Sequence, residues 1–167
     1  MNIFLDLEDT IIESWDNPIF LEEKISFIKK QIRTLLLDNI ELSGDINFIL
    51  FSMAVDNERS KKIFEERLKN KIEDIFKIEF KEIFVFSRKN INVLLNECLS
   101  VQFLDTDFLP DIFLRNEKEE LFELICMSRF KGSFNVLFDD TVSTFKKEIF
   151  EKDLFSKKST KIISIRV

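Results

Sequence analysis

Met1-Asn2-Ile3-Phe4-Leu5-Asp6-Leu7-Glu8-Asp9-Thr10 opens the chain and decides the fold that we expect. The apolar run at 3–5 is typical of a strand buried on both faces of a parallel sheet. Asp6, Glu8 and Asp9 follow at the carboxyl end of this strand. In open α/β sheets, ligands bind at that end of the strands.

Crowded carboxylates repel one another and do not stabilise a core. A Mg²⁺ ion relieves this repulsion, because it prefers hard oxygen ligands, usually carboxylates together with phosphate and water. An aspartate such as Asp6 can also attack phosphorus and form an aspartyl-phosphate. The alternative is an ordinary polar turn in which Asp9 or Thr10 caps the next helix. Short motifs are loose, so these residues alone leave both interpretations open.

The size and composition indicate one globular domain. We place it at 1–167, with a short irregular insert at about 100–115. The chain is 45% hydrophobic and 34% charged, which is typical of a folded protein. No apolar run reaches the length of a membrane span, and no signal peptide opens the chain, so we expect a cytoplasmic protein that does not bind membranes.

Missing residue types exclude several chemistries. The chain has no histidine, which removes Ser-His-Asp and Cys-His catalysis and the commonest zinc ligand. Cys98 and Cys126 lie in apolar helical contexts and are interpreted as buried free thiols. Gly44 and Gly132 are the only glycines, so glycine-rich phosphate loops are absent. Without histidine and with only two cysteines, any metal is expected to be bound by oxygen. A net charge of −6 disfavours general nucleic-acid binding.

Apolar periodicity predicts alternating strands and helices. We expect strands at 3–5, 46–51, 82–86, 134–138 and 161–167, the last of them at an edge of the sheet. We expect helices at 21–37, 59–76, 91–99, 117–129 and 144–155, whereas 101–114 has no regular period. This alternation predicts an α/β fold with a mainly parallel sheet and helices on both faces.

Polar residues follow the ends of the first, second and fourth predicted strands. They are Asp6, Ser52 and the pair Asp139-Asp140. Because the carboxyl ends of parallel strands meet at one edge, Asp6 and Asp140 are expected to form a Mg²⁺ site. Lys118 opens a helix just before the fourth strand, where a cation would offset phosphate charge. The alternatives are that Lys118 is a solvated lysine and that Ser52 caps the next helix.

The order of these elements resembles the haloacid dehalogenase-like (HAD) superfamily, which consists chiefly of Mg²⁺-dependent phosphatases. The residues that carry the resemblance are Ile3-Phe4-Leu5-Asp6-Leu7-Glu8-Asp9-Thr10, Phe48-Ile49-Leu50-Phe51-Ser52, Lys118 within Asn116-Glu117-Lys118-Glu119-Glu120-Leu121, and Val136-Leu137-Phe138-Asp139-Asp140. The resemblance implies a HAD-type Rossmann-like three-layer sandwich with a mainly parallel sheet and no full cap domain.

The resemblance also implies a role for each matching residue. Asp6 would be the nucleophile that becomes phosphorylated, and Thr10 would fix the turn. Ser52 and Lys118 would hold the phosphoryl group, with Arg115 as the alternative to Lys118. The implied Mg²⁺ ligands are Asp6, the backbone carbonyl of Glu8, Asp140 and, in support, Asp139.

One departure from the family concerns Glu8. The family's phosphatases carry a second aspartate two residues after the nucleophile, as general acid and base, and here that residue is Glu8. Glutamate has a similar acidity but is one methylene longer, and general acid–base catalysis is geometrically strict. Glu8 is expected either to perform this role less well or to mark a protein that has moved away from hydrolysis.

The expected function is a small Mg²⁺-dependent phosphatase that acts through Asp6 and Glu8. The gaps between the predicted elements are too short for a full cap domain. An open site suits bulky substrates, or a protein partner that completes it. The resemblance extends to small stand-alone relatives in large tailed bacteriophages, which favours nucleotides or nucleic-acid ends as substrates, in the host cytoplasm. The alternative is a catalytically weakened HAD-fold protein that binds or regulates. A nucleic-acid-binding module is disfavoured by the acidic charge.

Overall fold

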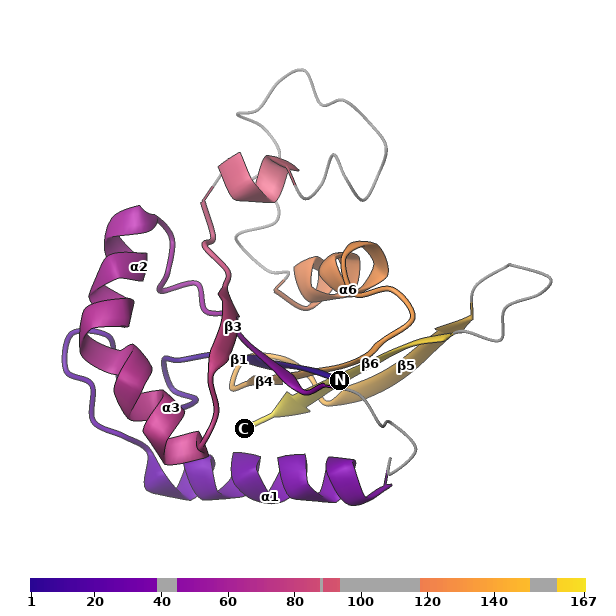
Figure 1. Ribbon diagram of the computed structural model, residues 1–167, viewed down its shortest axis with the longest axis horizontal. Coiled ribbons are helices and arrows are strands. Elements are labelled where there is room, and N and C mark those ends of the chain that lie inside the picture. The colour runs from indigo at the N-terminus through magenta and orange to yellow at the C-terminus, as the bar shows by residue number, and fades with distance from the viewer. Residues whose placement is uncertain (39–44, 88, 94–117, 151–158) are drawn as a thin grey trace.

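The computed structural model describes residues 1–38, 45–87, 89–93, 118–150 and 159–167 (Figure 1). The predicted irregular insert at about 100–115 lies outside these ranges. So does most of the helix predicted at 91–99, of which only 91–93 are described; they belong to a helical stretch at 89–93. Within the described ranges, no helix combines the length and the apolar character that are needed to cross a membrane.

A six-stranded sheet forms the centre of the molecule. Its strands are β1 (Asn2–Leu5), β2 (Asn47–Leu50), β3 (Phe80–Ile83), β4 (Phe134–Asp139), β5 (Phe145–Phe150) and β6 (Ser159–Arg166). They lie in the order β3-β2-β1-β4-β6-β5, and only the pairing of β5 with β6 is antiparallel. The predicted α/β fold with a mainly parallel sheet is confirmed.

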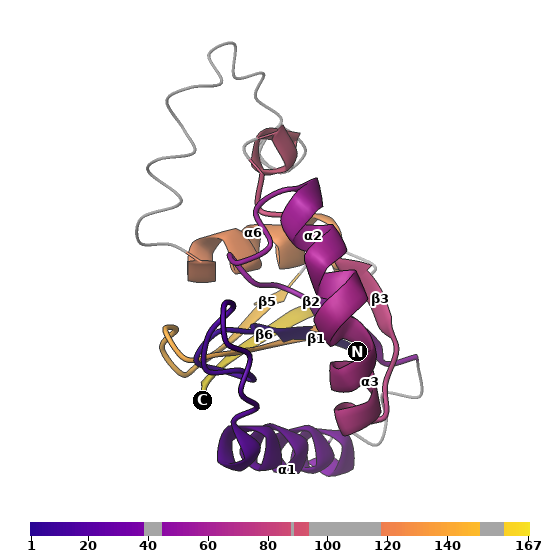
Figure 2. The ribbon, with the colours of Figure 1, turned by 90° about the vertical axis from the view of Figure 1, so that its left-hand side faces the viewer.

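Helices cover both faces of this sheet (Figures 1 and 2). They are α1 (Glu22–Asp38), α2 (Glu58–Phe64), the π-helical turn η1 (Glu65–Lys69), α3 (Asn70–Phe76) and α6 (Lys118–Ser128). The buried side chains of α1, α2 and α3 belong to one core cluster, and those of α6 belong to another. The helix predicted at 59–76 is therefore one helical run, interrupted only by η1.

β1 lies between β2 and β4, and the two core clusters bury both of its faces. Ile3 and Leu5 point into the core under α1, and Phe4 points into the core under α6. The Phe4 ring packs edge-on against Phe51 and Phe122, with ring centroids 5.7 and 5.0 Å apart. This burial accounts for the uninterrupted apolar run at the start of the chain.

The helix predicted at 144–155 is wrong where the structure describes it, because β5 is a strand. Phe145 and Ile149 are partly buried against the core under α6, while Lys146 and Lys147 are exposed. A spacing of four residues puts two side chains on one face of a helix, but also on one face of a strand.

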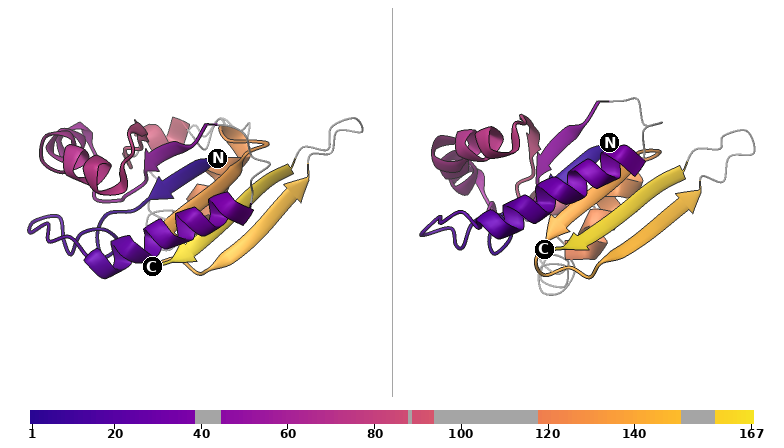
Figure 3. Two further views of the ribbon diagram at one scale, coloured as in Figure 1. Left: turned by 60° about the horizontal axis from the view of Figure 1, so that its bottom comes forward. Right: turned by 90° about the horizontal axis from the view of Figure 1, so that it is seen from below.

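The edge position predicted for the strand at 161–167 is wrong, because β6 lies inside the sheet and β5 forms the edge (Figure 3). The third strand begins earlier than predicted, at Phe80.

Three asparagines lie side by side across the amino ends of β2, β1 and β4. Asn2 pairs in register with Asn47 and Asn135. Its Nδ2 donates to Asn135 Oδ1 at 2.8 Å, and its Oδ1 accepts from Asn47 Nδ2 at 3.0 Å. A slip of one residue would break both bonds, so this ladder helps to fix the strand register.

The variant Asn2→Leu is expected to lower the free energy of unfolding by about 2–4 kcal/mol. It leaves a buried amide oxygen of Asn135 and the Nδ2 of Asn47 without their partner, and each lost partner costs about 1–3 kcal/mol. Urea unfolding measures the loss. The exposed Asn70 offers a control, because Asn70→Leu should change stability by no more than about 0.5 kcal/mol. Equal effects of the two substitutions would contradict a role for the ladder.

Candidate functional site

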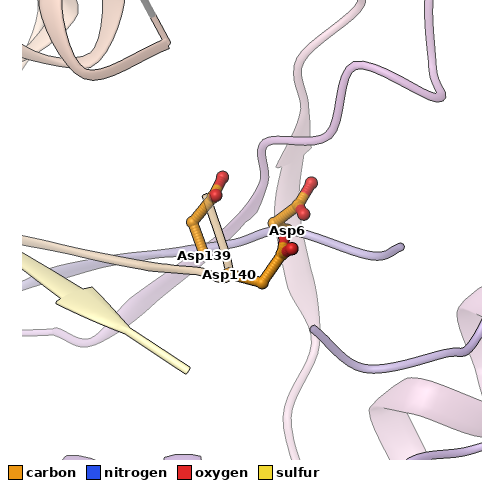
Figure 4. Close-up of side chains that lie close together, drawn as sticks. All are labelled: Asp6, Asp139 and Asp140. Carbon is orange, nitrogen blue, oxygen red and sulfur yellow. The ribbon is translucent and has the colours of Figure 1, made fainter. Parts of the chain in front are cut away.

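Three carboxylates meet at the carboxyl edge of the sheet (Figure 4). Asp6 follows β1, Asp139 ends β4, and Asp140 is the next residue. The parallel register pairs Leu5 with Phe138, so Asp6 comes to lie beside Asp139. One oxygen from each of the three side chains lies within 4.8 Å of the others. Asp6 and Asp139 are buried, and Asp140 is half-buried.

Lys118, the first residue of α6, inserts its ammonium between two of these carboxylates. Its Nζ lies 2.7 Å from Asp6 Oδ1 and also forms an ion pair with Asp139 Oδ2. The Lys118 side chain is only 10% exposed, so the alternative of a solvated lysine is wrong. Arg115, the other candidate cation, lies outside the described residues.

Threonine hydroxyls hold the acidic residues in place. Thr10 Oγ1 lies 3.2 Å from Asp6 Oδ2 and 3.4 Å from Asp140 Oδ1, and it accepts a hydrogen bond from the Asp140 N–H at 3.1 Å. A hydroxyl has one proton, so Thr10 donates to one of the two carboxylates at a time. Asp139 Oδ1 accepts from both the N–H and the hydroxyl of Thr141, at 2.8 and 2.6 Å.

Ser52 is buried just beyond the end of β2, and its hydroxyl lies near Asp6, where it acts to lower the pKa of that carboxyl against the larger effect of burial. The alternative of a helix cap is wrong, because the side chain of Asn57 caps α2 by accepting from the Arg59 and Ser60 N–H groups. Ser52 therefore belongs to the surroundings of the Asp6 carboxylate, as the sequence predicted.

Glu8 lies in the turn after β1, but it is not among the three closely spaced carboxylates within the described residues. Its Oε1 instead accepts a hydrogen bond of 2.8 Å from the backbone N–H of Trp15. Trp15 belongs to a hairpin-like segment that is closed where Ile12 bridges Phe20. This contact ties Glu8 to the hairpin-like segment and leaves Oε2 for other partners.

Asp9 adopts a left-handed backbone, with φ of 52°. Aspartate tolerates this conformation better than most residues. The Asp9 carbonyl accepts a hydrogen bond from the ammonium of Lys24 on α1. The alternative of a helix cap by Asp9 or Thr10 is wrong, because α1 starts only at Glu22. Sequence reasoning missed Lys24, which looks like any other lysine on an amphipathic helix.

The surroundings shift the pKa values of the three aspartates in different directions. Burial raises the pKa of Asp6, against the opposing effect of Lys118, and the nearby Asp139 charge raises this pKa further. Burial also acts to raise the pKa of Asp139, but the Lys118 charge and hydrogen bonds from Lys118 and Thr141 together hold this pKa below its ordinary value. Burial and the Asp139 charge raise the pKa of Asp140.

The donor set fits a metal ion. Three ionised carboxylates and one ammonium sum to a local charge of −2, which a divalent cation would neutralise. Burial is the main cause of the raised pKa values of Asp6 and Asp140, and the negative charge of Asp139 raises both further, so a bound cation would favour the ionised form of these two groups. Carboxylate-only sites suit hard cations.

Comparison of the chain with protein-family models, with curated proteins and with solved structures finds no match in any of the three. The fold and the site define the class of protein. It is an α/β protein with an acidic triad at the carboxyl edge of its sheet, and this triad could bind a metal ion.

Proposed function

We propose that the chain is a Mg²⁺-dependent phosphatase of the HAD type, which hydrolyses phosphate monoesters through an aspartyl-phosphate on Asp6. The observation that carries the proposal is the set of contacts around the Asp6 carboxylate. An ammonium from Lys118 and hydroxyls from Thr10 and Ser52 all reach it, beside Asp139 and Asp140. The order of these residues along the chain agrees with the family resemblance.

In this proposal, a carboxylate oxygen of Asp6 attacks the phosphorus, and the bond to the ester oxygen breaks. The leaving oxygen takes a proton from Glu8, and water then releases phosphate and regenerates Asp6. Lys118, which forms an ion pair with Asp6, and Ser52, which lies near it, would hold the transferred phosphoryl oxygens. Mg²⁺ bound by Asp6, Asp140 and the Glu8 carbonyl, with Asp139 in support, would supply the positive charge that phosphoryl transfer requires.

The substrates proposed are nucleotides or nucleic-acid ends, in line with the open site expected from the sequence. The test is phosphate release from nucleotides, 3′- and 5′-phosphorylated oligonucleotides and phosphopeptides, with Mg²⁺ or with EDTA. We expect release from at least one nucleotide or oligonucleotide, and its loss in EDTA. Silence across the whole panel in Mg²⁺ would contradict the phosphatase, and release from phosphopeptides alone would contradict the substrate class.

The second candidate is a weakened HAD-fold protein that binds a phosphorylated partner without turnover. The observation that favours it is the Glu8 carboxylate, one oxygen of which is engaged by the Trp15 N–H. An acid held this way has less freedom to reach a leaving group.

The substitution Glu8→Asp separates the two candidates. If Glu8 is the working acid, shortening it breaks the Trp15 contact and moves the carboxyl group by about 1 Å, so kcat should fall roughly 10- to 100-fold. Steady-state kinetics on the best substrate of the panel measure the change, with Glu13→Asp, at an exposed position nearby, as the control. A gain of similar size would instead favour the weakened protein.

A further inference from the structure

A second feature lies away from the acidic triad, in a groove between α1 and α3. Two hollows of about 370 and 390 Å³ lie next to each other, since Lys29 and Ile75 line both. The apolar residues that line them are Phe20, Ile25, Ile32, Leu36, Phe48, Ile75 and Phe76. Leu36, one of these lining residues, is 38% exposed. The apolar floor is thus only partly covered by the described part of the chain.

Positive charge borders this groove. Lys29, Arg33 and Lys77 line it, against a single acidic residue, Glu22, at one end. All three cations are exposed, and none forms an ion pair with a carboxylate of the described residues. The Lys29 ammonium lies 5.7 Å from the ring centroid of Phe76. A cationic border of this kind stands out on a chain whose net charge is −6.

We propose that this groove, which we call the α1–α3 groove, binds an acidic amphipathic helix of a partner protein. The apolar face of such a helix, with residues at i, i+3 or i+4, and i+7, would cover the floor. Its flanking aspartates and glutamates would pair with Lys29, Arg33 and Lys77. α1 has 17 residues and is about 25 Å long, so it can lie beside roughly four to five turns of a bound helix.

Charge and shape argue against two other occupants of the α1–α3 groove. A second copy of this chain docking groove to groove would bring the same cations together, and like charges across an interface are repulsive. An anionic membrane is flat and cannot fill a groove, and it repels a chain with a net charge of −6. This inference does not depend on the chemistry at Asp6.

The test is fluorescence polarisation with a labelled synthetic helix of about 18 residues that carries leucines on one face and glutamates on its flanks. The comparison peptides are the same sequence with lysine for every glutamate, and an acidic scramble without an apolar face. We expect the acidic helix to bind at least about tenfold more tightly than either, and to bind more weakly as salt rises. Equal affinities for the acidic and basic helices, or no binding of the acidic helix at millimolar protein, would overturn the proposal.

Variants locate the binding surface. The double variant Arg33→Glu/Lys77→Glu should weaken binding at least about tenfold, and Leu36→Gln should weaken it several-fold. Lys146→Glu, at an exposed position on β5, is the matched control and should change nothing. Phosphate release should be the same in all of these proteins. Unchanged binding in the double variant would overturn the proposal. So would stronger binding to phosphatidylserine vesicles than to the peptide, or a dimer in sedimentation that the double variant abolishes.

Discussion

Replacing Asp6 with asparagine is expected to abolish phosphate release and, in metal-free buffer, to make the protein more stable. Asparagine fits the same space but cannot attack phosphorus, so kcat should fall by about 10⁴-fold or more, the scale seen when a nucleophile is removed. The stability gain has a separate cause. Asp6 is buried beside Asp139, and its charged form is disfavoured there even with Lys118 in contact.

The pH dependence of this gain follows from the raised pKa of Asp6. A carboxyl group whose pKa is higher in the folded state adds stability below its unfolded pKa, and that contribution is lost as pH rises through the folded pKa. The advantage of Asp6→Asn over wild type should therefore be small in acid, grow as pH rises from about 4 through the folded pKa of Asp6, and level off above it. Each kcal/mol gained should raise Tm by about 2–4 °C.

Thermal unfolding in EDTA at several pH values, beside phosphate release in Mg²⁺, checks both parts of this prediction. Asp16→Asn, at an exposed position in the same loop region, should leave Tm and kcat unchanged. Wild-type turnover by Asp6→Asn would rule out Asp6 as the nucleophile. A lower Tm throughout the pH range would show that the ion pair with Lys118 outweighs the burial of the carboxylate.

The sequence predicted the centre of this protein well, because the central strands are determined by local composition. Each of β1, β2 and β4 contains a short apolar run that is followed closely by a polar residue. A parallel arrangement then brings Asp6, Ser52 and Asp139 to one edge, with no further information needed. The position of Lys118 could also be predicted, since a helix that precedes β4 begins near that same edge.

The remainder depends on contacts between distant segments. The spacing of Phe145 and Ile149 is compatible with a helix and with a strand. The segment is a strand because it pairs with β6. The contact of Glu8 with the Trp15 N–H, and that of Lys24 with the Asp9 carbonyl, depend on how the chain returns after the turn. No local pattern encodes that return path, so these contacts could not be predicted.

Replacing Lys118 with methionine is expected to have the second-largest effect, on stability and activity together. The ammonium of Lys118 is in contact with Asp6 and with Asp139, and among the described residues Asp139 Oδ2 accepts no other hydrogen bond. Removing one partner of a buried ion pair costs about 3–5 kcal/mol, because the remaining charge is left uncompensated. Phosphate release should fall about 10²- to 10³-fold, the scale of losing one charged or hydrogen-bonding contact to the reacting group.

The loss of stability in Lys118→Met should shrink as pH falls. The pKa of Asp139 is held below its ordinary value with help from Lys118, so this pair contributes stability above the unfolded pKa and loses it as pH falls through the folded pKa. Urea unfolding at neutral and acid pH measures this change. Lys118→Arg keeps the charge and should recover part of the stability, while the exposed Lys131→Met should behave as wild type.

Mg²⁺ supplies the decisive comparison for the Lys118 variant. If Asp6, Asp139 and Asp140 bind the cation, Mg²⁺ replaces the missing positive charge and should raise the Tm of Lys118→Met more than that of wild type. An equal Mg²⁺ effect on both proteins would mean that the cation binds away from these carboxylates. The ion pair of Lys118 would then be a structural contact only, and the case for a phosphoryl-transfer site at this edge of the sheet would fail.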